Sequence, residues 1–442
     1  DLDNHQYYVS TKNIIFGNMN PQIQNIISTN ILLQAYRHMM EAKALADIYE
    51  ENRKLCPYVH STSRGHEAIQ LATAYHLTHE DWVSPYYRDD SLLLGMGFTP
   101  YQLMLQLLAK KEDPFSGGRS YYSHPSNLEE SLPKIIHQSS ATGTQALQYI
   151  EEFKLKTFEG SPIALCSLGD NSVTEGEVSE ALQFAALHQL PILFLVQDNE
   201  WGISITKEEA RTTDAYEFTE GFKGLSRMRL DGTDFGVCYE GMKKAIDFVR
   251  TERRPMVVCA KTVLIGHHTS GVRREFYRDE ENLEQHRAKD PGKILYYQLL
   301  EENISKEVLN EIEVESIQKI KKEFERALQA PDPDASSVSD HIFAPTPYTQ
   351  EQGIRTPNDT KEKIVMVDAA VHAIQEIMYK HPEAVLYGQD VGERIGGVFR
   401  ETVTLGQKFG NKRVFNTPIQ EAYIIGSTIG MSALGLKPIV EV

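Results

Sequence analysis

The chain has 442 residues, which is too long for one ordinary domain, so two or three domains are expected. The hydrophobic and charged fractions, 41% and 24%, are those of a globular protein, and the net charge of −17 argues against a nucleic-acid-binding surface. No apolar run is long enough to cross a membrane, and the four cysteines form no C-x-x-C pair. We therefore expect free thiols in a reducing compartment and assign the chain to the cytoplasm.

Residues 1–330 are expected to alternate between helices, polar loops and buried strands. In chain order, the expected elements are helices at 31–52, 68–77, from 91 and at 100–110, a strand at 162–168, a helix at 174–189, a strand at 191–197, a helix at 235–251, a strand at 255–263 and helices over 292–329. The last of these helices are highly charged, which predicts a solvated helical tail.

The strand–helix–strand unit at 162–197 carries the strongest chemical signal. Thr174 is predicted to cap its helix, with Glu177 completing a capping box. Parallel strands joined by a right-handed crossover end on one edge of the sheet, so Asp170 and Asn199 are expected side by side. Hard oxygens beside a helix N-terminus suit magnesium and a diphosphate. An Asp cap and an Asn turn would explain the same two residues, and their spacing alone leaves both interpretations open.

Other polar residues at loops and strand ends are further candidates. Tyr87 and Arg88 could hydrogen-bond a phosphate, although a surface loop arginine is the more ordinary explanation when these residues are taken alone. His268 follows a strand and could act as an acid or base, or could be a structural histidine. His124 lies in irregular chain. Glu421 lies in a predicted first helical turn, where an acid favours the helix dipole without any further role.

The composition changes after residue 330. Residues 331–360 are rich in proline and predict a linker or an extended arm. A second unit over 361–442 is expected to contain a helix at 364–379, a strand at 384–387 and a strand at 438–442. Between these strands, Thr417 to Gln420 is predicted to open a helix as a capping box with proline at the first helical position. Because the unit ends on a strand, we expect it to be incomplete.

These stretches together resemble the thiamine-diphosphate-dependent decarboxylating component of 2-oxoacid dehydrogenase complexes. The segment Gly169-Asp170-Asn171, followed by Asn199, is similar to the thiamine-diphosphate motif of that family. Residues 31–330 resemble its alpha subunit. Residues 361–442 resemble the start of its beta subunit, through 385–392, 396–400 and 413–421. The resemblance implies alpha and beta subunits fused in one chain, with an α/β thiamine-diphosphate-binding fold of parallel sheets flanked by helices.

The resemblance also implies roles for individual residues. Asp170, Asn199 and the backbone oxygen of Trp201 would bind Mg²⁺; Tyr87, Arg88, Gly169 and Asn171 would hold the diphosphate; His268 would lie beside the thiazolium ring; His124 would assist acyl transfer; and Glu421 would hydrogen-bond the aminopyrimidine ring. The chain departs from the family pattern where Asn171 replaces a glycine and where Asp198 and Gln183 replace asparagines.

The implied reaction is oxidative decarboxylation of a 2-oxo acid, with reductive acylation of a lipoyl group on a dihydrolipoyl acyltransferase partner. Gly266-His267-His268 resembles the branched-chain members, so branched-chain 2-oxo acids are favoured and pyruvate stays open. A homodimer of fused chains is expected, with no nucleic-acid or membrane partner. The alternatives are a transketolase-like enzyme that uses the same cofactor without lipoyl transfer, and a non-catalytic cofactor-binding homologue.

Overall fold

The computed structural model describes residues 14–15, 27–136, 138–147, 161–343 and 362–442. Its contacts divide the chain into two compact units, Asp1–Pro331 and Asp332–Val442. Most of the predicted linker at 331–360 lies outside the described residues. Among the described helices, none is long and apolar enough to cross a membrane.

The first unit is built on a six-stranded parallel sheet with the order β1-β7-β8-β4-β3-β2. Its strands are β1 (Ile14–Ile15), β2 (Trp82–Ser84), β3 (Ala164–Gly169), β4 (Ile192–Asp198), β7 (Ser226–Asp231) and β8 (Met256–Lys261). Strands β3 and β4 are buried along their whole length, as expected for apolar runs in the centre of a parallel sheet. Helices flank this sheet, so the predicted fold class is confirmed.

The pairing of β3 with β4 confirms the strand–helix–strand unit expected from the sequence. Gly169, the last residue of β3, is paired with Gln197 of β4. Asp170 and Asp198 therefore follow at the same edge of the sheet, and Asn199 comes one residue later. The predicted position of the polar strand ends is thus reproduced, although the carboxylate nearest to Asp170 in register is Asp198.

The helix between these strands begins later than predicted. Residues Asn171–Thr174 form a 3₁₀ turn, η3, and the helix α6 spans Gly176–His188 with Glu175 at its N-cap. The Thr174 hydroxyl donates a hydrogen bond of 2.8 Å to the Asn171 carbonyl oxygen inside the turn. Because the N-cap residue is Glu175 and no side chain caps the helix, the predicted capping box of Thr174 and Glu177 is wrong.

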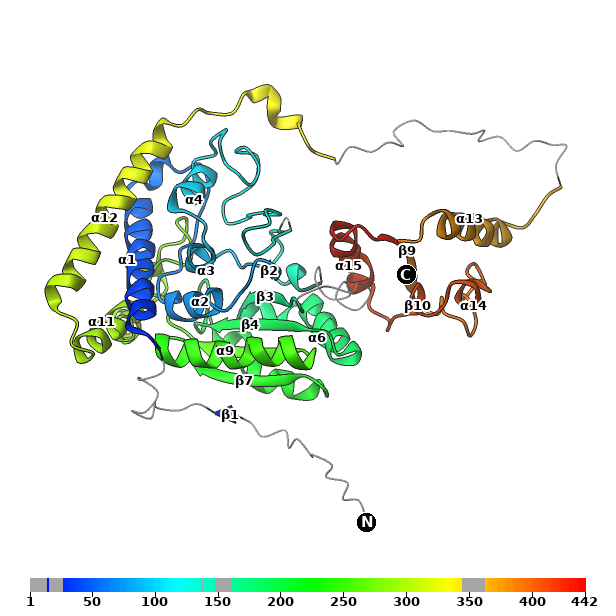
Figure 1. Ribbon diagram of the computed structural model, residues 1–442, viewed down its shortest axis with the longest axis horizontal. Coiled ribbons are helices and arrows are strands. Elements are labelled where there is room, and N and C mark those ends of the chain that lie inside the picture. The colour runs from blue at the N-terminus through cyan, green and yellow to red at the C-terminus, as the bar shows by residue number, and fades with distance from the viewer. Residues whose placement is uncertain (1–13, 16–26, 137, 148–160, 344–361) are drawn as a thin grey trace, which may run out of the picture. The chain divides into compact units, whose positions relative to one another are not determined.

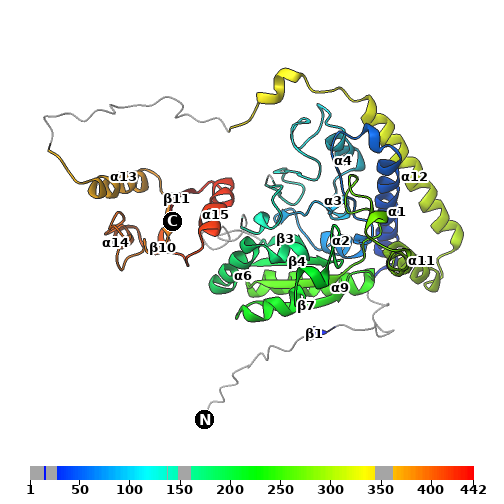
Figure 2. The ribbon, with the colours of Figure 1, turned by 180° about the vertical axis from the view of Figure 1, so that it is seen from behind.

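The expected solvated tail is also wrong, because its long helix is part of the core. Helix α12 (Lys306–Gln329) packs on α1 (Thr29–Glu51), and the two lie side by side in Figures 1 and 2. Leu309, Ile312, Ile320 and Phe324 of α12 are buried in the main hydrophobic cluster. These residues follow helical spacing, so the charged residues between them occupy the other faces of the helix.

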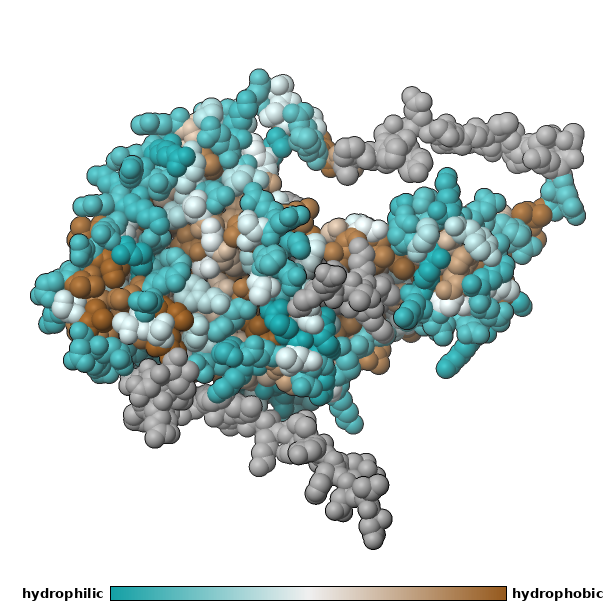
Figure 3. Space-filling view, in the orientation of Figure 1, coloured by the Kyte–Doolittle hydropathy of each residue, from teal (hydrophilic) through white to brown (hydrophobic). Residues whose placement is uncertain are grey.

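The remaining described elements of the first unit are short or cover the sheet. They are η1 (Arg53–Leu55), α2 (Glu67–Ala74), α3 (Asp90–Met96), α4 (Pro100–Leu107), η2 (Thr144–Leu147), β5 (Trp201–Gly202), β6 (Ile205–Thr206), α7 (Lys207–Ala210), α8 (Ala215–Phe218), η4 (Thr219–Gly221), α9 (Phe235–Glu252), η5 (Arg274–Phe276), α10 (Glu280–Ala288) and α11 (Pro291–Glu301). Helix α9 packs on β4, β7 and β8, and α2 packs on α9. Figure 3 shows apolar surface over α11 and α12, where Tyr297 and Ile317 are exposed.

The second unit contains a three-stranded parallel sheet with the order β10-β9-β11. After the short η6 (Ala335–Ser339), its elements are α13 (Met366–Lys380), β9 (Ala384–Gly388), α14 (Leu405–Phe409), β10 (Val414–Asn416), α15 (Glu421–Ala433) and β11 (Lys437–Glu441). The predicted helix and both strands are present, but α15 begins at Glu421 after a non-helical Gln420. The capping box predicted over Thr417–Gln420 is wrong, because Gln420 is itself the N-cap residue and Thr417 lies outside the helix.

Candidate active site

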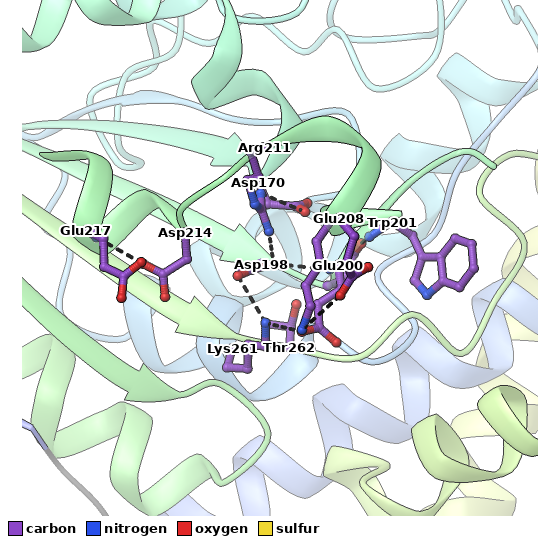
Figure 4. Close-up of polar contacts among 12 residues, drawn as sticks. Asp170, Asp198, Glu200, Trp201, Glu208, Arg211, Asp214, Glu217, Lys261 and Thr262 are labelled. Atoms are coloured by element: carbon purple, nitrogen blue, oxygen red, sulfur yellow. Dashed lines mark hydrogen bonds and ion pairs between the residues drawn. The ribbon is translucent and has the colours of Figure 1, made fainter. Parts of the chain in front are cut away.

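Two carboxylates lie at the ends of β3 and β4, and one arginine bridges them. The Arg211 guanidinium is 3.0 Å from an oxygen of Asp170 and 2.8 Å from an oxygen of Asp198 (Figure 4). Arg211 directly follows α7, so the short β5–β6 hairpin and this helix carry it back to the sheet edge. The arrangement is a buried cluster of two negative charges and one shared positive charge.

The two carboxylates differ in how fully they are compensated. Asp198 also contacts Lys261 at 3.1 Å, and Lys261 in turn contacts Glu200 at 2.6 Å. The Asp170 Oδ2 atom is buried, and among the described residues its compensation is the 3.0 Å ion pair with Arg211, which lacks the geometry of a hydrogen bond. Burial, together with repulsion from Asp198, raises the pKa of Asp170 to about 7, although Arg211 opposes the shift.

Asn199 is held from both ends of its amide. Its Oδ1 atom accepts a hydrogen bond of 3.0 Å from the Trp201 backbone N–H, and its Nδ2 atom lies 3.1 Å from Nε2 of His66. Both Asn199 and His66 are buried. The backbone oxygen of Trp201, expected as a further metal ligand, stays a prediction.

This donor set fits a hard divalent cation. Two carboxylates and one amide oxygen gather at the edge, and magnesium takes few protein ligands beside phosphate oxygens and water. The buried Asp170 Oδ2 atom, which has an ion pair with Arg211 but no hydrogen bond of good geometry, is the kind of acceptor that such an ion would satisfy. Among the described residues, no group of three or more His, Cys, Asp or Glu side chains could hold a metal by itself, so water and phosphate would have to complete the ligand set.

A second cluster contains the predicted phosphate and thiazolium residues. The Arg88 side chain is almost fully buried, has no ion-pair partner among the described residues, and leaves its Nε atom without a hydrogen bond. A buried cation with no carboxylate in salt-bridge contact among the described residues suits an anionic ligand such as a diphosphate. Its Nη2 atom lies 3.5 Å from Nδ1 of His268, and the Tyr87 hydroxyl lies 3.1 Å from Nε2 of that histidine.

The hydrogen bonds around His268 determine its tautomer. The Ile203 backbone N–H donates to Nδ1 over 3.2 Å, so Nδ1 is an acceptor and the ring proton lies on Nε2, toward Tyr87. Burial, assisted by the Arg88 charge, lowers the pKa of His268 to about 3. The ring is therefore neutral at physiological pH.

Three of the predicted residues share one cavity of about 530 Å³, namely Tyr87, His124 and His268. His124 donates from Nδ1 to the Tyr122 carbonyl oxygen over 2.8 Å, and its Nε2 atom accepts from the Ser140 hydroxyl over 2.9 Å. Fixing one ring nitrogen on a carbonyl leaves the other as an acceptor, which is the form that a proton-accepting histidine needs. The structure thus brings together residues that are far apart in the sequence.

Asn171, which stands where the family pattern has a glycine, lies against Gly202. A methyl group at Gly202 would overlap the Asn171 amide nitrogen, so Asn171 fills the space beside a residue without a side chain. The Asn171 Oδ1 atom is buried and has no hydrogen-bond partner among the described residues. Gly169, also expected at the diphosphate, faces the Tyr86 hydroxyl, which leaves no room for a larger residue there.

Glu421 belongs to the second unit and lies on its surface. Its carboxylate accepts a hydrogen bond of 3.0 Å from Gln389, and this contact lowers the pKa of Glu421. The structure of this unit alone does not bury the carboxylate, and its role toward a cofactor ring stays a prediction.

Sequence reasoning missed two residues of this site, Arg211 and His66. Arg211 lies in a stretch without periodicity, and His66 lies in a polar loop that leads into α2, so neither position carries a local pattern that points to the sheet edge. Their approach to Asp170 and Asn199 depends on tertiary contacts.

Comparison with known proteins shows the family. Residues 28–336, more than half of the chain, match the Dehydrogenase E1 component family, and residues 362–442 match the Transketolase, pyrimidine binding domain family. The chain therefore belongs to the dehydrogenase E1 component family, the thiamine-diphosphate-dependent component of 2-oxoacid dehydrogenases. Membership implies thiamine diphosphate as the cofactor and a lipoyl acyltransferase as the partner.

Individual relatives are alpha subunits with two different names. The chain is 28% identical to the 2-oxoisovalerate dehydrogenase subunit alpha of Bacillus subtilis over 321 residues, 70% of this chain and 94% of that protein. It is 27% identical to the mitochondrial 2-oxoisovalerate dehydrogenase subunit alpha 2 of Arabidopsis thaliana over 60% of this chain, and it spans only 56% of that protein. It is 27% identical to the pyruvate dehydrogenase E1 component subunit alpha of Mycoplasma genitalium, over 69% of this chain and 80% of that protein.

Proposed function

We propose that this chain decarboxylates a 2-oxo acid with thiamine diphosphate and Mg²⁺ and passes the acyl group to the lipoyl group of a dihydrolipoyl acyltransferase. Residues 1–330 would bind the metal and the diphosphate, 331–360 would form a linker, and 361–442 would contribute the pyrimidine-binding face. Branched-chain 2-oxo acids are the favoured substrates, because Gly266-His267-His268 resembles the branched-chain members.

The observation that carries this proposal is a common cavity next to a buried arginine. Tyr87, His124 and His268 line one cavity, and the buried Arg88 lies 3.5 Å from His268, with no carboxylate in salt-bridge contact among the described residues. The cavity thus presents two orientated histidines, and one of them adjoins a cation that suits an anionic ligand. The carboxylate pair at the edge of β3 and β4 would supply the metal ligands.

Thiamine diphosphate, when bound, would supply the carbanion chemistry, and the protein would supply binding and orientation. Arg88 and Tyr87 would hold phosphate oxygens. His268, neutral with its proton on Nε2, would donate a hydrogen bond to a developing oxyanion. His124, whose Nε2 atom is free to hold a proton beside Ser140, would pass that proton to the lipoyl sulfur that leaves when the disulfide opens.

The place of Glu421 motivates the proposed homodimer of fused chains. A cofactor held by the first unit needs a second face that carries Glu421, and in the resembled family these faces belong to different subunits. Mass photometry of the active protein should show dimers. Full activity in a monomeric fraction would contradict this arrangement.

Titration with thiamine diphosphate and Mg²⁺, followed by decarboxylation assays, tests the proposed function. We expect magnesium-dependent cofactor binding and faster carbon dioxide release from 3-methyl-2-oxobutanoate than from pyruvate. The variant Asp170→Ala should lose the metal-dependent part of the binding. Failure of the full-length protein to bind thiamine diphosphate would refute the proposal.

The variant Glu421→Ala tests the second unit separately. It should keep most of the cofactor affinity but lose hydrogen–deuterium exchange at the thiazolium carbon, because the carboxylate would act on the aminopyrimidine ring. Normal exchange would leave Glu421 as an ordinary acid in a first helical turn.

A further inference from the structure

A buried chain of hydrogen bonds runs from Asp89 to Asn199 through Gln197 and His66. The Gln197 Nε2 atom donates to Asp89 Oδ1 over 2.7 Å, and the Gln197 Oε1 atom lies 2.8 Å from Nδ1 of His66. The Nε2 atom of His66 lies 3.1 Å from Nδ2 of Asn199. All four side chains are at least 95% buried, so no bulk water is available to exchange these partners.

Asp89 determines which atoms donate and which accept along this series of hydrogen bonds. An ionised carboxylate only accepts hydrogen bonds, so the Gln197 atom beside Asp89 is the amide nitrogen. The Gln197 oxygen consequently faces His66, and it also accepts from Gln70 Nε2 over 2.8 Å. The His66 Nδ1 atom must then carry the proton and donate it to Gln197.

The contacts of Asn199 lead independently to the same tautomer of His66. The Trp201 backbone N–H is a donor, so the Asn199 atom that lies 3.0 Å from it is the amide oxygen. The Asn199 nitrogen then faces His66 and requires Nε2 of that ring to be an acceptor. A histidine with its proton on Nδ1 and a free lone pair on Nε2 satisfies both ends.

We infer that His66 is a positioning residue, whose Nδ1–H tautomer holds the Asn199 amide with its nitrogen toward the core and its oxygen toward the strand-end edge. Asn199 Oδ1 is the atom proposed to bind the metal, so the inference rests on the proposed function. Without the acceptor at His66 Nε2, the amide nitrogen would be buried and unsatisfied, and only the Trp201 N–H would still oppose turning the amide over. A turned amide would present a donor to the cation, which metal ions do not tolerate.

Two substitutions of His66 distinguish a positioning role from a packing role. Each one replaces a different ring nitrogen with a polar atom. His66→Gln extends an oxygen to the former place of Nε2 and so retains an acceptor for Asn199. His66→Asn reaches only the former place of Nδ1 and retains the contact with Gln197 alone. His76→Gln is the control: this histidine contacts the Tyr239 carbonyl oxygen at 2.9 Å and packs on the Tyr239 ring.

Binding of Mn²⁺ to the full-length protein, with and without thiamine diphosphate, can be followed by electron paramagnetic resonance. We expect His66→Asn to weaken Mn²⁺ binding about 10- to 100-fold, as for other residues that orientate metal ligands, and His66→Gln to stay within about threefold of the wild type. His76→Gln should match the wild type. Equal losses for the two His66 variants, or no loss for His66→Asn, would overturn the inference.

A tautomer measurement needs no bound metal and keeps the test independent of the proposed function. With ¹⁵N-labelled histidine, the His66 signals are those missing from the spectrum of His66→Gln, and we expect them to show a proton on Nδ1. A proton on Nε2 would overturn the inference. A wild-type protein that binds no Mn²⁺ but shows the Nδ1–H form would refute the proposed metal site and leave the tautomer assignment intact.

Discussion

Arg211 lies 3.0 Å from Asp170 and gives this buried carboxylate its ion pair at the end of β3. The same guanidinium also contacts Asp198. The Arg211 side chain therefore occupies the position between the two carboxylates where the proposed metal would bind. A divalent cation at Asp170 and the guanidinium at its present place would compete for the same oxygens. A metal bound to Asp170 Oδ2, as proposed, would displace Arg211 from that oxygen.

The variant Arg211→Gln should show this competition as a change in stability. Without metal, the two buried carboxylates lose their shared counter-ion, and unfolding free energy should fall by about 3 kcal/mol. Added Mg²⁺ should then raise Tm more in Arg211→Gln than in the wild type, because the ion replaces the missing charge. Arg37→Gln, which removes an exposed pair with Glu315, is the control and should change little. Equal Mg²⁺-induced shifts in Tm for the wild type and Arg211→Gln would contradict the competition.

The facing pair Asn171 and Gly202 should be strongly coupled. Gly202→Ala should destabilise the protein by about 1–3 kcal/mol, because its methyl group overlaps the Asn171 amide. Adding Asn171→Gly should remove the clash, so the double variant should recover most of the loss in urea unfolding. Gly176→Ala is the matched control, since a methyl group there meets nothing within 4 Å. Additive losses in the double variant would show that the overlap is not the cause.

The buried Asp90 should make stability depend on pH. Burial, opposed by the hydrogen bond from Tyr122, raises the pKa of Asp90 from 3.8 to about 7. Between these values the folded protein holds a proton that the unfolded chain has released, so unfolding free energy falls as pH rises through this window and levels off above it. Asp90→Asn lacks this proton, so its stability relative to the wild type should rise between pH 5 and pH 8.

Thermal unfolding at these two pH values measures the effect of Asp90→Asn. The cost of burying the new amide group is the same at both pH values and cancels in the comparison. Asp47→Asn, which alters an exposed partner of Lys43, should show no such trend. A constant difference between Asp90→Asn and the wild type would contradict the raised pKa.

His268 should remain neutral over the working range of pH. Its pKa is lowered to about 3 by burial and by Arg88, so its ring signals in ¹⁵N-labelled protein should not shift between pH 5.5 and 8. Replacing Arg88 with glutamine removes the opposing charge and should raise the pKa of His268, although burial keeps it below the usual value of 6.5. A titration midpoint near 6.5 in the wild type would show that the ring is solvated.

The sequence by itself determined the centre of this protein. The apolar runs that became β3 and β4 are continuous, and only a parallel sheet covered on both faces buries such runs, so the polar residues after them had to share an edge. The order of distant motifs was enough to identify the family. The start of α6 and the burial of α12 were not predictable in this way, because a 3₁₀ turn takes up the residues before α6 and the apolar face of α12 packs on α1.

Only the tertiary structure decided which groups surround Asp170 and Asn199. Arg211 arrives on a hairpin and a short helix, and His66 arrives from the loop before α2, so no local spacing relates them to the strand ends. Their roles depend on burial, which removes water and makes each charge or hydrogen bond find a protein partner. Local periodicity reports which face of an element is buried, whereas the partners of a buried polar group are set by chain segments that meet only in the folded protein.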